Sequence, residues 1–480
     1  MKKNYIVVDL GTGNSRIALV SSDGSMIDIK SFENVYYKDE LYEDAQYFLP
    51  EEWEKIILEK CKELIQDNPQ IEISAVTSSG ARESIVLLNK KGKAYLGLPN
   101  IDNRGRQWME EIQDKKYIYE KTGRWVTEDF PAAKLYGLKK KHPDLYDDIG
   151  KITSISEWIG AIFVGKIVME PSQACETQLY DIEAMEWSQR ICNYYGIQKS
   201  ILPQVQKAGT SIGKIKKELC NELSLSEHVE FIVGGADTQV AVKGSNIKTG
   251  DVGIVAGTTS PVVTIVDQKY YDKKERCWTD CNIGGENYQV ETNPGVTGLN
   301  YQRLKKLLFN NTSYEELDYL MKQKKDFLCT ASFSSLNFSQ RKSLKKGGFV
   351  IGAPLSDRID LIDLLWASVA DMACAIFVQY NSLCELIPHS KGYILGCGGG
   401  LQSDVLCQMI STLTGKELII YKGFEQASVL GCVKICNEYF KILSKESEEI
   451  EKCYKPETKG LIQKYYPVWL KNREMLNPDI

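Results

Sequence analysis

The sequence has few of the residues on which several common kinds of chemistry depend. Its 480 residues include three histidines, His142, His228 and His389, which stand far apart in the chain. A histidine metal site or a Ser-His-Asp triad is therefore not expected. The fourteen cysteines contain no Cys-x-x-Cys pair. This scatter argues against a zinc finger and favours free, mostly buried thiols in a reducing compartment.

Surplus positive charge and long apolar runs are also lacking. The net charge is −5, and lysine clusters such as 139–141 are too short to form a basic face, so we expect no nucleic-acid partner. Asp9 interrupts the apolar run near the N-terminus, and no run reaches the about 18–20 uninterrupted apolar residues of a membrane span. We therefore expect a cytoplasmic protein with a buried first strand and no membrane partner.

The two most familiar phosphate-binding loops are absent from the sequence. No Walker A lysine motif occurs, and the glycine cluster GCGGG at 396–400 does not match Gly-x-Gly-x-x-Gly. Neither a P-loop nor a Rossmann site is supported. Any nucleotide must be held by other elements.

What the sequence does have is length and mixed patterning. A chain of 480 residues exceeds the about 250–300 residues that one hydrophobic core supports. Residues 51–66 carry apolar side chains at helical spacing, whereas 71–80 read as a buried strand. We expect an α/β protein with domains at 1–245 and 246–480. Because no Pro- or Ser-rich linker separates them, the two domains should share a cleft and a hinge.

Two Gly-Thr hairpins open the two halves of the chain. VVDLGTGNSRIALV at 7–20 and GIVAGTTSPVVTIV at 253–266 each have an apolar strand, a Gly-Thr turn and a second apolar strand. Glycine allows a close backbone approach, and the nearby amides and hydroxyls can donate to phosphate oxygens. The two hairpins therefore predict a duplicated domain plan with phosphate groups held between them.

Two aspartates and a glycine cluster accompany the hairpins. Asp9 precedes the first turn and reads either as a Mg²⁺ ligand or as a turn cap. Asp237 follows a Gly-Gly-Ala turn at the end of an apolar run, where a carboxylate could serve as a general base. Residues 398–400 offer either a bare shelf for an adenine ring or a tightly packed helix entry.

In combination and order, these features resemble the FGGY carbohydrate kinases, within the actin/Hsp70-like ATPases, over nearly the whole chain. The resemblance implies two actin/Hsp70-like (ribonuclease H-like) domains flanking a nucleotide cleft. It implies ATP and Mg²⁺ as cofactors, Asp9 and Asp237 as metal ligands, and Asp237 as the catalytic base. The implied nucleotide contacts are Gly11, Thr12, Asn14, Arg16, Gly257, Thr258, Thr259, Gly298, Gly398, Gly399, Gly400 and Ser403.

Residues 130–142 and 347–372 are similar to the two signatures of that family, with departures at Gly137 and Ala370 that weaken a close kinship with glycerol kinases. The substrate-side segments SSGARES, NIDNRGR and VGGADTQ resemble those of the autoinducer-2 kinases. This implies the linear form of 4,5-dihydroxy-2,3-pentanedione as substrate, with a xylulose- or ribulose-type ketose as the alternative. The candidate substrate contacts are Arg82, Glu83, Asn100, Asp102, Arg104, Asp237 and Gln239.

The substrate residues suit a small polyhydroxylated carbonyl compound. Carboxylates accept from vicinal hydroxyls, and arginines donate to carbonyl oxygens in a fixed fork. Arg82 and Glu83 have a second interpretation as a surface pair.

At the level of the whole protein, the alternatives are an actin/Hsp70-like ATPase that needs no small substrate and a silent sugar-binding regulator. Dimers are common among the proteins that this chain resembles, so a homodimer is one expectation.

Overall fold

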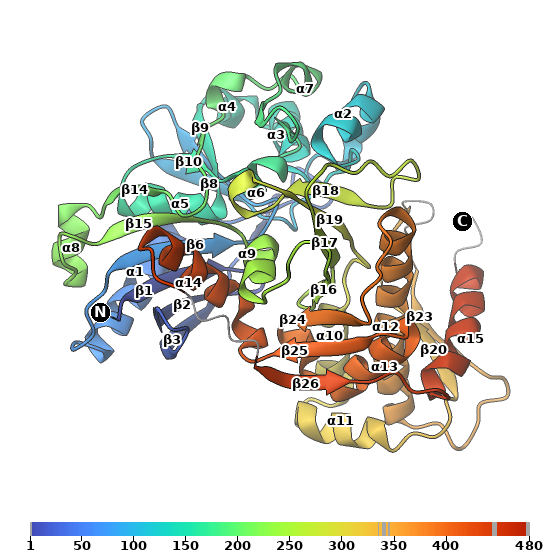
Figure 1. The fold of residues 1–480 in the computed structure, drawn as a ribbon. Coiled ribbons are helices and arrows are strands. Elements are labelled where there is room, and N and C mark those ends of the chain that lie inside the picture. The colour runs from blue at the N-terminus through green and yellow to red at the C-terminus, as the bar shows by residue number, and fades with distance from the viewer. Residues whose placement is uncertain (1, 335, 338–341, 344–345, 444–448, 477–480) are drawn as a thin grey trace.

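The computed structural model describes the chain except for residues 1, 335, 338–341, 344–345, 444–448 and 477–480, and its core consists of two β-sheets with helices around them (Figure 1). The N-terminal half of the chain lies on one side of the molecule and most of the C-terminal half on the other. The sequence predicts a polar helix over residues 465–480, and its last four residues fall outside the described part.

The first sheet consists entirely of strands from the N-terminal half. Its six strands run in the order β14 (Ser211–Lys214), β15 (Glu230–Ala236), β6 (Ala75–Gly80), β1 (Asn4–Leu10), β2 (Asn14–Ser21) and β3 (Met26–Glu33). Alternate residues of β1 serve two cores: Ile6 and Val8 belong to one cluster, and Tyr5 and Val7 to another on the opposite face. A strand covered on both faces reads as a continuous apolar run, as this one does.

The second sheet repeats that plan with strands from the C-terminal half. Its seven strands run in the order β18 (Trp278–Cys281), β19 (Tyr288–Thr292), β17 (Val262–Val266), β16 (Val252–Val255), β24 (Tyr393–Cys397), β25 (Glu417–Tyr421) and β26 (Ile450–Tyr454). β16 pairs antiparallel with β17 and parallel with β24, just as β1 pairs antiparallel with β2 and parallel with β6. The expected duplication is thus present in the topology as well as in the two hairpins.

Amphipathic and apolar helices cover the sheets. α1 (Pro50–Asp67) buries Trp53, Ile57, Cys61 and Leu64, which lie on one helical face. α12 (Leu361–Leu386) begins at a capping box formed by Asp360 and Asp363. α12 has the length and mean hydropathy (1.9) of a membrane-crossing helix, but 72% of that apolar window is buried inside the protein. It is the core helix of the second half.

Two short helices pack together between the sheets. α9 (Asp237–Gly244) follows β15, and α14 (Ala427–Tyr439) comes from the C-terminal half yet packs against α9, β1 and β6 (Figure 1). Tyr5 donates a hydrogen bond to Asn437 at 2.8 Å, and Cys432 lies in the same apolar cluster as Tyr5. The C-terminal half therefore contributes a helix to the core of the first sheet.

The remaining elements form smaller sheets and surface helices. A three-stranded sheet has the order β8 (Ala94–Leu98), β7 (Ile85–Asn89) and β9 (Ile149–Ser154). Two-stranded sheets pair β4 (Tyr37–Lys38) with β5 (Gln46–Tyr47), β10 (Val168–Met169) with β13 (Gln204–Val205), β11 (Tyr180–Asp181) with β12 (Glu186–Trp187), β20 (Cys329–Ser332) with β23 (Gly348–Ile351), and β21 (Leu336–Asn337) with β22 (Lys342–Ser343). The other α-helices are α2 (Lys115–Thr122), α3 (Pro131–Lys141), α4 (Pro143–Asp147), α5 (Ile155–Phe163), α6 (Pro171–Cys175), α7 (Gln189–Tyr194), α8 (Lys217–Leu223), α10 (Gly298–Leu308), α11 (Tyr314–Lys322), α13 (Asp404–Thr414) and α15 (Leu461–Leu476).

Candidate active site

Asp237 is the first residue of α9, directly after the buried strand β15. We expected Gly234, Gly235 and Ala236 to form a bare turn, and this was wrong because all three lie inside β15. A side chain at Gly234 would place its Cβ 1.7 Å from the carbonyl oxygen of Ser78 on the neighbouring strand. Gly234 is therefore needed for close strand packing. The Asp237 carboxylate is presented by the start of α9 and not by a turn.

The Asp237 carboxylate lies among other charged groups. It accepts hydrogen bonds from the backbone N–H of Thr238 at 2.6 Å and from the Thr238 hydroxyl at 3.2 Å. Burial raises the pKa of Asp237 to about 6, with Arg82 lowering it and Asp9 raising it further. A carboxyl with this pKa is mostly ionised at neutral pH and can accept a proton.

Asp9 is held by donors from both halves of the chain. Its carboxylate accepts from Arg16 at 2.8 Å, from Ser79 at 3.0 Å and from Ser428 of α14 at 2.8 Å. Arg16, an expected phosphate contact, pairs here with Asp9 and also donates to Ser428 at 3.0 Å. The first hairpin, β6 and α14 therefore meet at Asp9.

The tip of the first hairpin is fixed by side chains from elsewhere in the N-terminal half. Asn100 donates from Nδ2 to the Thr12 hydroxyl at 2.9 Å, and Tyr36 donates to the Thr12 carbonyl at 2.7 Å. Gly11 precedes this turn, and Asn14 begins β2 with its side chain exposed. The expected phosphate and substrate residues Thr12 and Asn100 are thus direct neighbours.

The other glycine segments meet at the second hairpin. The Thr258 carbonyl accepts from the backbone N–H of Thr297 at 3.1 Å and that of Leu299 at 3.4 Å, and Thr259 forms a β-bridge with Val296. The N–H of Gly400 donates to the Ala256 carbonyl at 2.9 Å. The structure therefore brings together the expected nucleotide residues Gly257, Thr258, Thr259, Gly298, Gly398, Gly399 and Gly400.

A buried group of charged side chains, which we did not predict, contacts Arg82. Arg82 pairs with Glu291 at 2.7 Å and lies 3.5 Å from Glu176, while Arg124 pairs with both Glu176 and Asp280 at 2.6 Å. Each of these residues is at most 7% exposed. In the sequence, these charged residues stand singly among apolar or small residues, as Asp280 does in CWTDC and Glu291 in YQVET. A single charged residue within an apolar strand is the one signal by which the sequence could have indicated them.

The protein is similar to known sugar kinases over most of its length. Residues 4–244 match the model of the FGGY family of carbohydrate kinases, N-terminal domain. The chain is 39% identical over 451 residues to the Bacillus subtilis (strain 168) protein named "Putative sugar kinase YoaC", covering 94% of this chain and 92% of that protein. This chain belongs to the FGGY family of carbohydrate kinases. The expected family is confirmed, and with it an enzyme that transfers a phosphoryl group from ATP to a hydroxyl of a small sugar.

Solved structures of FGGY kinases confirm the expected two-domain actin/Hsp70-like fold. The glycerol kinase of Plasmodium falciparum, solved with ADP, superimposes with a TM-score of 0.86 at 16% identity, covering 99% of both chains. The autoinducer-2 kinase of Enterobacter sp. (strain 638) is 26% identical over 267 residues, which are 53% of this chain and 49% of that protein. Further relatives are named xylulose kinase and gluconokinase.

Of the expected site residues of this FGGY kinase, Ser403 has protein partners for its hydroxyl, whereas the Gln239 side chain has none among the described residues. Ser403 caps α13, accepting from the backbone N–H of Leu406 at 3.2 Å and donating to Asp318 at 2.6 Å. Gln239, a candidate substrate contact, would point to the same pocket as Asp237 only if the chain were extended there, but α9 begins at Asp237. Two residues apart on a helix, the two side chains do not share a face. Both polar atoms of the buried Gln239 side chain lack a protein partner.

The residues that we expected to contact the substrate lie in two separate groups in the structure. Arg82 and Glu83 lie in a turn, and the Arg82–Glu291 pair excludes the interpretation of Arg82 as a surface residue. Asp102 is occupied by the protein: it accepts from Arg104 at 2.7 Å and from the backbone N–H of Gln46 at 3.0 Å. The buried Lys134 connects the two groups because it donates to the Glu83 carbonyl at 2.7 Å and interacts electrostatically with Asp102 and Glu83.

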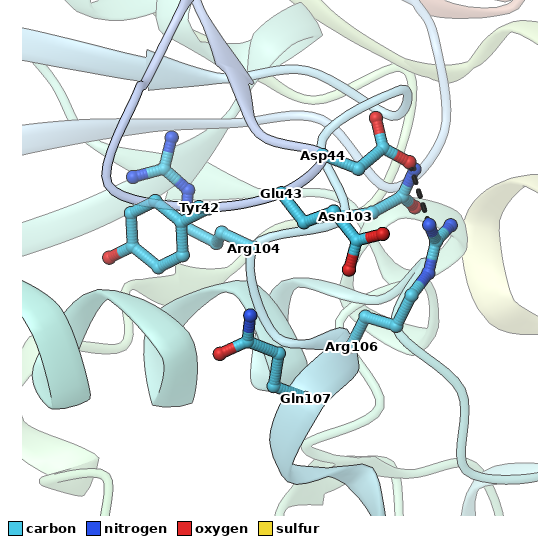
Figure 2. Close-up of a pocket in the computed structure, with 7 residues that line it drawn as sticks. All are labelled: Tyr42, Glu43, Asp44, Asn103, Arg104, Arg106 and Gln107. Carbon is cyan, nitrogen blue, oxygen red and sulfur yellow. Dashed lines mark hydrogen bonds and ion pairs between the residues drawn. The ribbon is translucent and has the colours of Figure 1, made fainter.

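Arg104 lines a small surface pocket that does not include Asp237 (Figure 2). The Arg104 guanidinium lies 5.2 Å from the centroid of the Tyr42 ring and is drawn above that ring in Figure 2. An ion pair of 2.8 Å joins Asp44 to Arg106, as the dashed line shows. The pocket is lined by Tyr42, Glu43, Asp44, Asn103, Arg104, Arg106 and Gln107. Arg104 therefore shapes this loop, and nothing in its contacts connects it directly to Asp237.

Proposed function

We propose that this kinase transfers the γ-phosphoryl group of ATP to a hydroxyl of a small neutral sugar or sugar-like polyol, with Asp237 as general base. The observation that carries the proposal is the placement of Asp237: it lies at the start of α9, its pKa is raised to about 6 by burial, and it is within electrostatic reach of Asp9 and Arg82. A base with a pKa near the working pH accepts a proton efficiently as the substrate oxygen attacks phosphorus.

The chain's own groups have separate tasks in this reaction. Asp237 accepts the proton of the attacking hydroxyl. Arg82 lowers the pKa of Asp237 and so helps to keep this carboxyl ionised at neutral pH. The amides and hydroxyls of Gly11–Thr12 and Gly257–Thr259 hold the phosphates from two sides. With domains at 1–245 and 246–480, closure of the two halves excludes water from the site, which suppresses hydrolysis without sugar.

Mg²⁺ fits the donors present at Asp9 and Asp237. The Asp9 carboxylate raises the pKa of Asp237 by repulsion, and a divalent cation with oxygen ligands would relieve this repulsion. When bound, the ion neutralises negative charge on the phosphates. To hold the ion, Asp9 would give up its contact with Arg16 Nε, and that nitrogen would then be available for a phosphate oxygen.

For the substrate we propose the linear form of 4,5-dihydroxy-2,3-pentanedione, with a xylulose- or ribulose-type ketose as the alternative. The support is the set of substrate-side segments around Arg82, Asn100 and Asp237, together with the match to autoinducer-2 kinases over about half of their length. The carboxylate Glu83 beside Arg82 suits a ligand with vicinal hydroxyls and a carbonyl group.

The test is ADP release by the purified full-length protein over a panel of acceptors. The panel contains dihydroxypentanedione, D- and L-xylulose, D- and L-ribulose, rhamnulose, gluconate, glycerol and erythritol. We expect one neutral compound to raise ADP release at least about 100-fold over the rate without acceptor. Preference for a ketose over dihydroxypentanedione would replace the favoured substrate by the alternative. Fast ATP hydrolysis that no acceptor changes would contradict the proposal and favour an actin/Hsp70-like ATPase.

A further inference from the structure

The charged group beside Arg82 contains several buried polar atoms that no protein atom completes. They are Arg124 Nε and Nη1, Glu176 Oε2, Asp280 Oδ2, Gln289 Oε1 and Glu291 Oε1. Leaving one such atom without a partner costs about 1–3 kcal/mol, and native proteins contain few of them. Their concentration in one place indicates that a polar ligand or ordered water completes this group.

The orientation of Arg124 is fixed by its surroundings. Its side chain is fully buried, and its guanidinium lies 4.5 Å from the centroid of the Trp278 ring and 5.3 Å from that of Phe130. One nitrogen, Nη2, contacts both Glu176 and Asp280 at 2.6 Å, whereas Nε and Nη1 have no partner. A rigid guanidinium with two unused donors is a built recognition element, since little ordering entropy is lost when it binds.

The group is assembled from both halves of the chain. Arg82, Arg124 and Glu176 precede residue 245, whereas Asp280 in β18 and Glu291 in β19 belong to the second sheet, and α6, which precedes Glu176, packs against β18. The site is complete only when β18 and β19 lie against the first half. Arg82 also interacts with Asp237, so the group adjoins the proposed base.

The balance of charge decides which ligand fits. Two arginines face three carboxylates, Glu176, Asp280 and Glu291, whose unused oxygens are hydrogen-bond acceptors. A ligand with several hydroxyls can donate to these oxygens and accept from Arg124. An additional carboxylate would meet an excess of like charge in a site that excludes water, where repulsion is strong.

We propose that Arg124, Glu176 and Asp280, together with Gln289 and Glu291, form the specificity site for the sugar, which binds neutral polyhydroxylated compounds and rejects sugar acids. The inference rests on the proposed function, because it adds the substrate class to the site around Asp237. It predicts a different substrate preference from that named for the gluconokinases among its relatives.

Binding is measured by calorimetry on the full-length protein, without ATP, for D-xylulose, D-ribulose and dihydroxypentanedione and for D-gluconate. For the wild type we expect at least one neutral compound to bind about tenfold or more tightly than D-gluconate. Asp280→Asn should lower the affinity for that neutral compound about 10- to 100-fold, because Arg124 loses a charged partner. It should also reduce the ratio of this affinity to the affinity for D-gluconate. A purely structural ion pair would leave the ratio of the two affinities unchanged.

The matched control is Asp272→Asn, which removes the buried partner of Arg276 in the segment just before β18. It should leave both affinities within about twofold. Glu176→Gln is a second variant of the site. The preference of the wild type for neutral compounds over D-gluconate is itself a test, and it does not depend on the folding of any variant. The inference is overturned if gluconate binds the wild type as tightly as every neutral compound, if no neutral compound binds, or if the folded Asp280→Asn protein keeps both affinities. Missing ADP release with intact selective binding counts against the proposed reaction instead.

Discussion

The carboxyl of Asp237 is poised by the residues around it. Burial raises its pKa to about 6, Arg82 opposes this effect, and Asp9 adds to it. The raised pKa of Asp237 could not be predicted from its neighbours in the sequence, because Asp9 lies in β1 and Arg82 follows β6. The position of Asp237 after an apolar run was readable in the sequence, but the start of α9 was not.

The pH dependence of the reaction follows from this pKa. A base must be ionised, so kcat/KM should be constant at neutral pH and fall about tenfold per pH unit below about 6. An unperturbed aspartate would show the same fall only near pH 4. The measurement is sugar-dependent ADP release between pH 4.5 and 8, with ADP quantified directly. A profile that stays flat down to pH 5 would show that Asp237 does not limit the rate as a base.

At the scale of elements, the hairpins were predictable and their partners were not. The patterns at 7–20 and 253–266 predict two strand–turn–strand units because apolar runs flank Gly-Thr turns. The pairing of β16 with β24, and the packing of α14 against the first sheet, join residues more than 100 positions apart. Local patterns cannot specify such contacts. For the same reason, the group around Arg124 could not be found from sequence spacing.

The start of α10 supports the second hairpin, and this can be tested at Gly298. A Cβ on this residue would lie 2.1 Å from the Gly257 carbonyl oxygen, so Gly298→Ala must displace the hairpin. We expect a loss of about 1–3 kcal/mol in the free energy of unfolding and a weaker affinity for ATP. Gly392→Ala is the control, because its Cβ would meet no atom within 4 Å. Equal stability and equal ATP affinity for the two variants would contradict the role of Gly298.

For the whole molecule, the two sheets share one topological plan and meet at α9 and α14 (Figure 1). The charged pairs Arg82–Glu291 and Arg124–Asp280 join the halves next to Asp237. The proposed sugar site and the contact between the halves therefore use the same side chains. In our proposal this arrangement couples sugar binding to closure, and closure limits transfer of the phosphoryl group to water.

The central claim, that Asp237 is the base of a sugar kinase, is tested most directly by comparing the wild type with Asp237→Asn. The measurement is sugar-dependent ADP release with the best acceptor of the panel, alongside ADP affinity by calorimetry and with Asp272→Asn as the folded control. We predict that Asp237→Asn lowers kcat about 10²- to 10⁴-fold while ADP affinity stays within a few-fold of the wild type. A variant that keeps the wild-type rate of phosphorylation would contradict the claim.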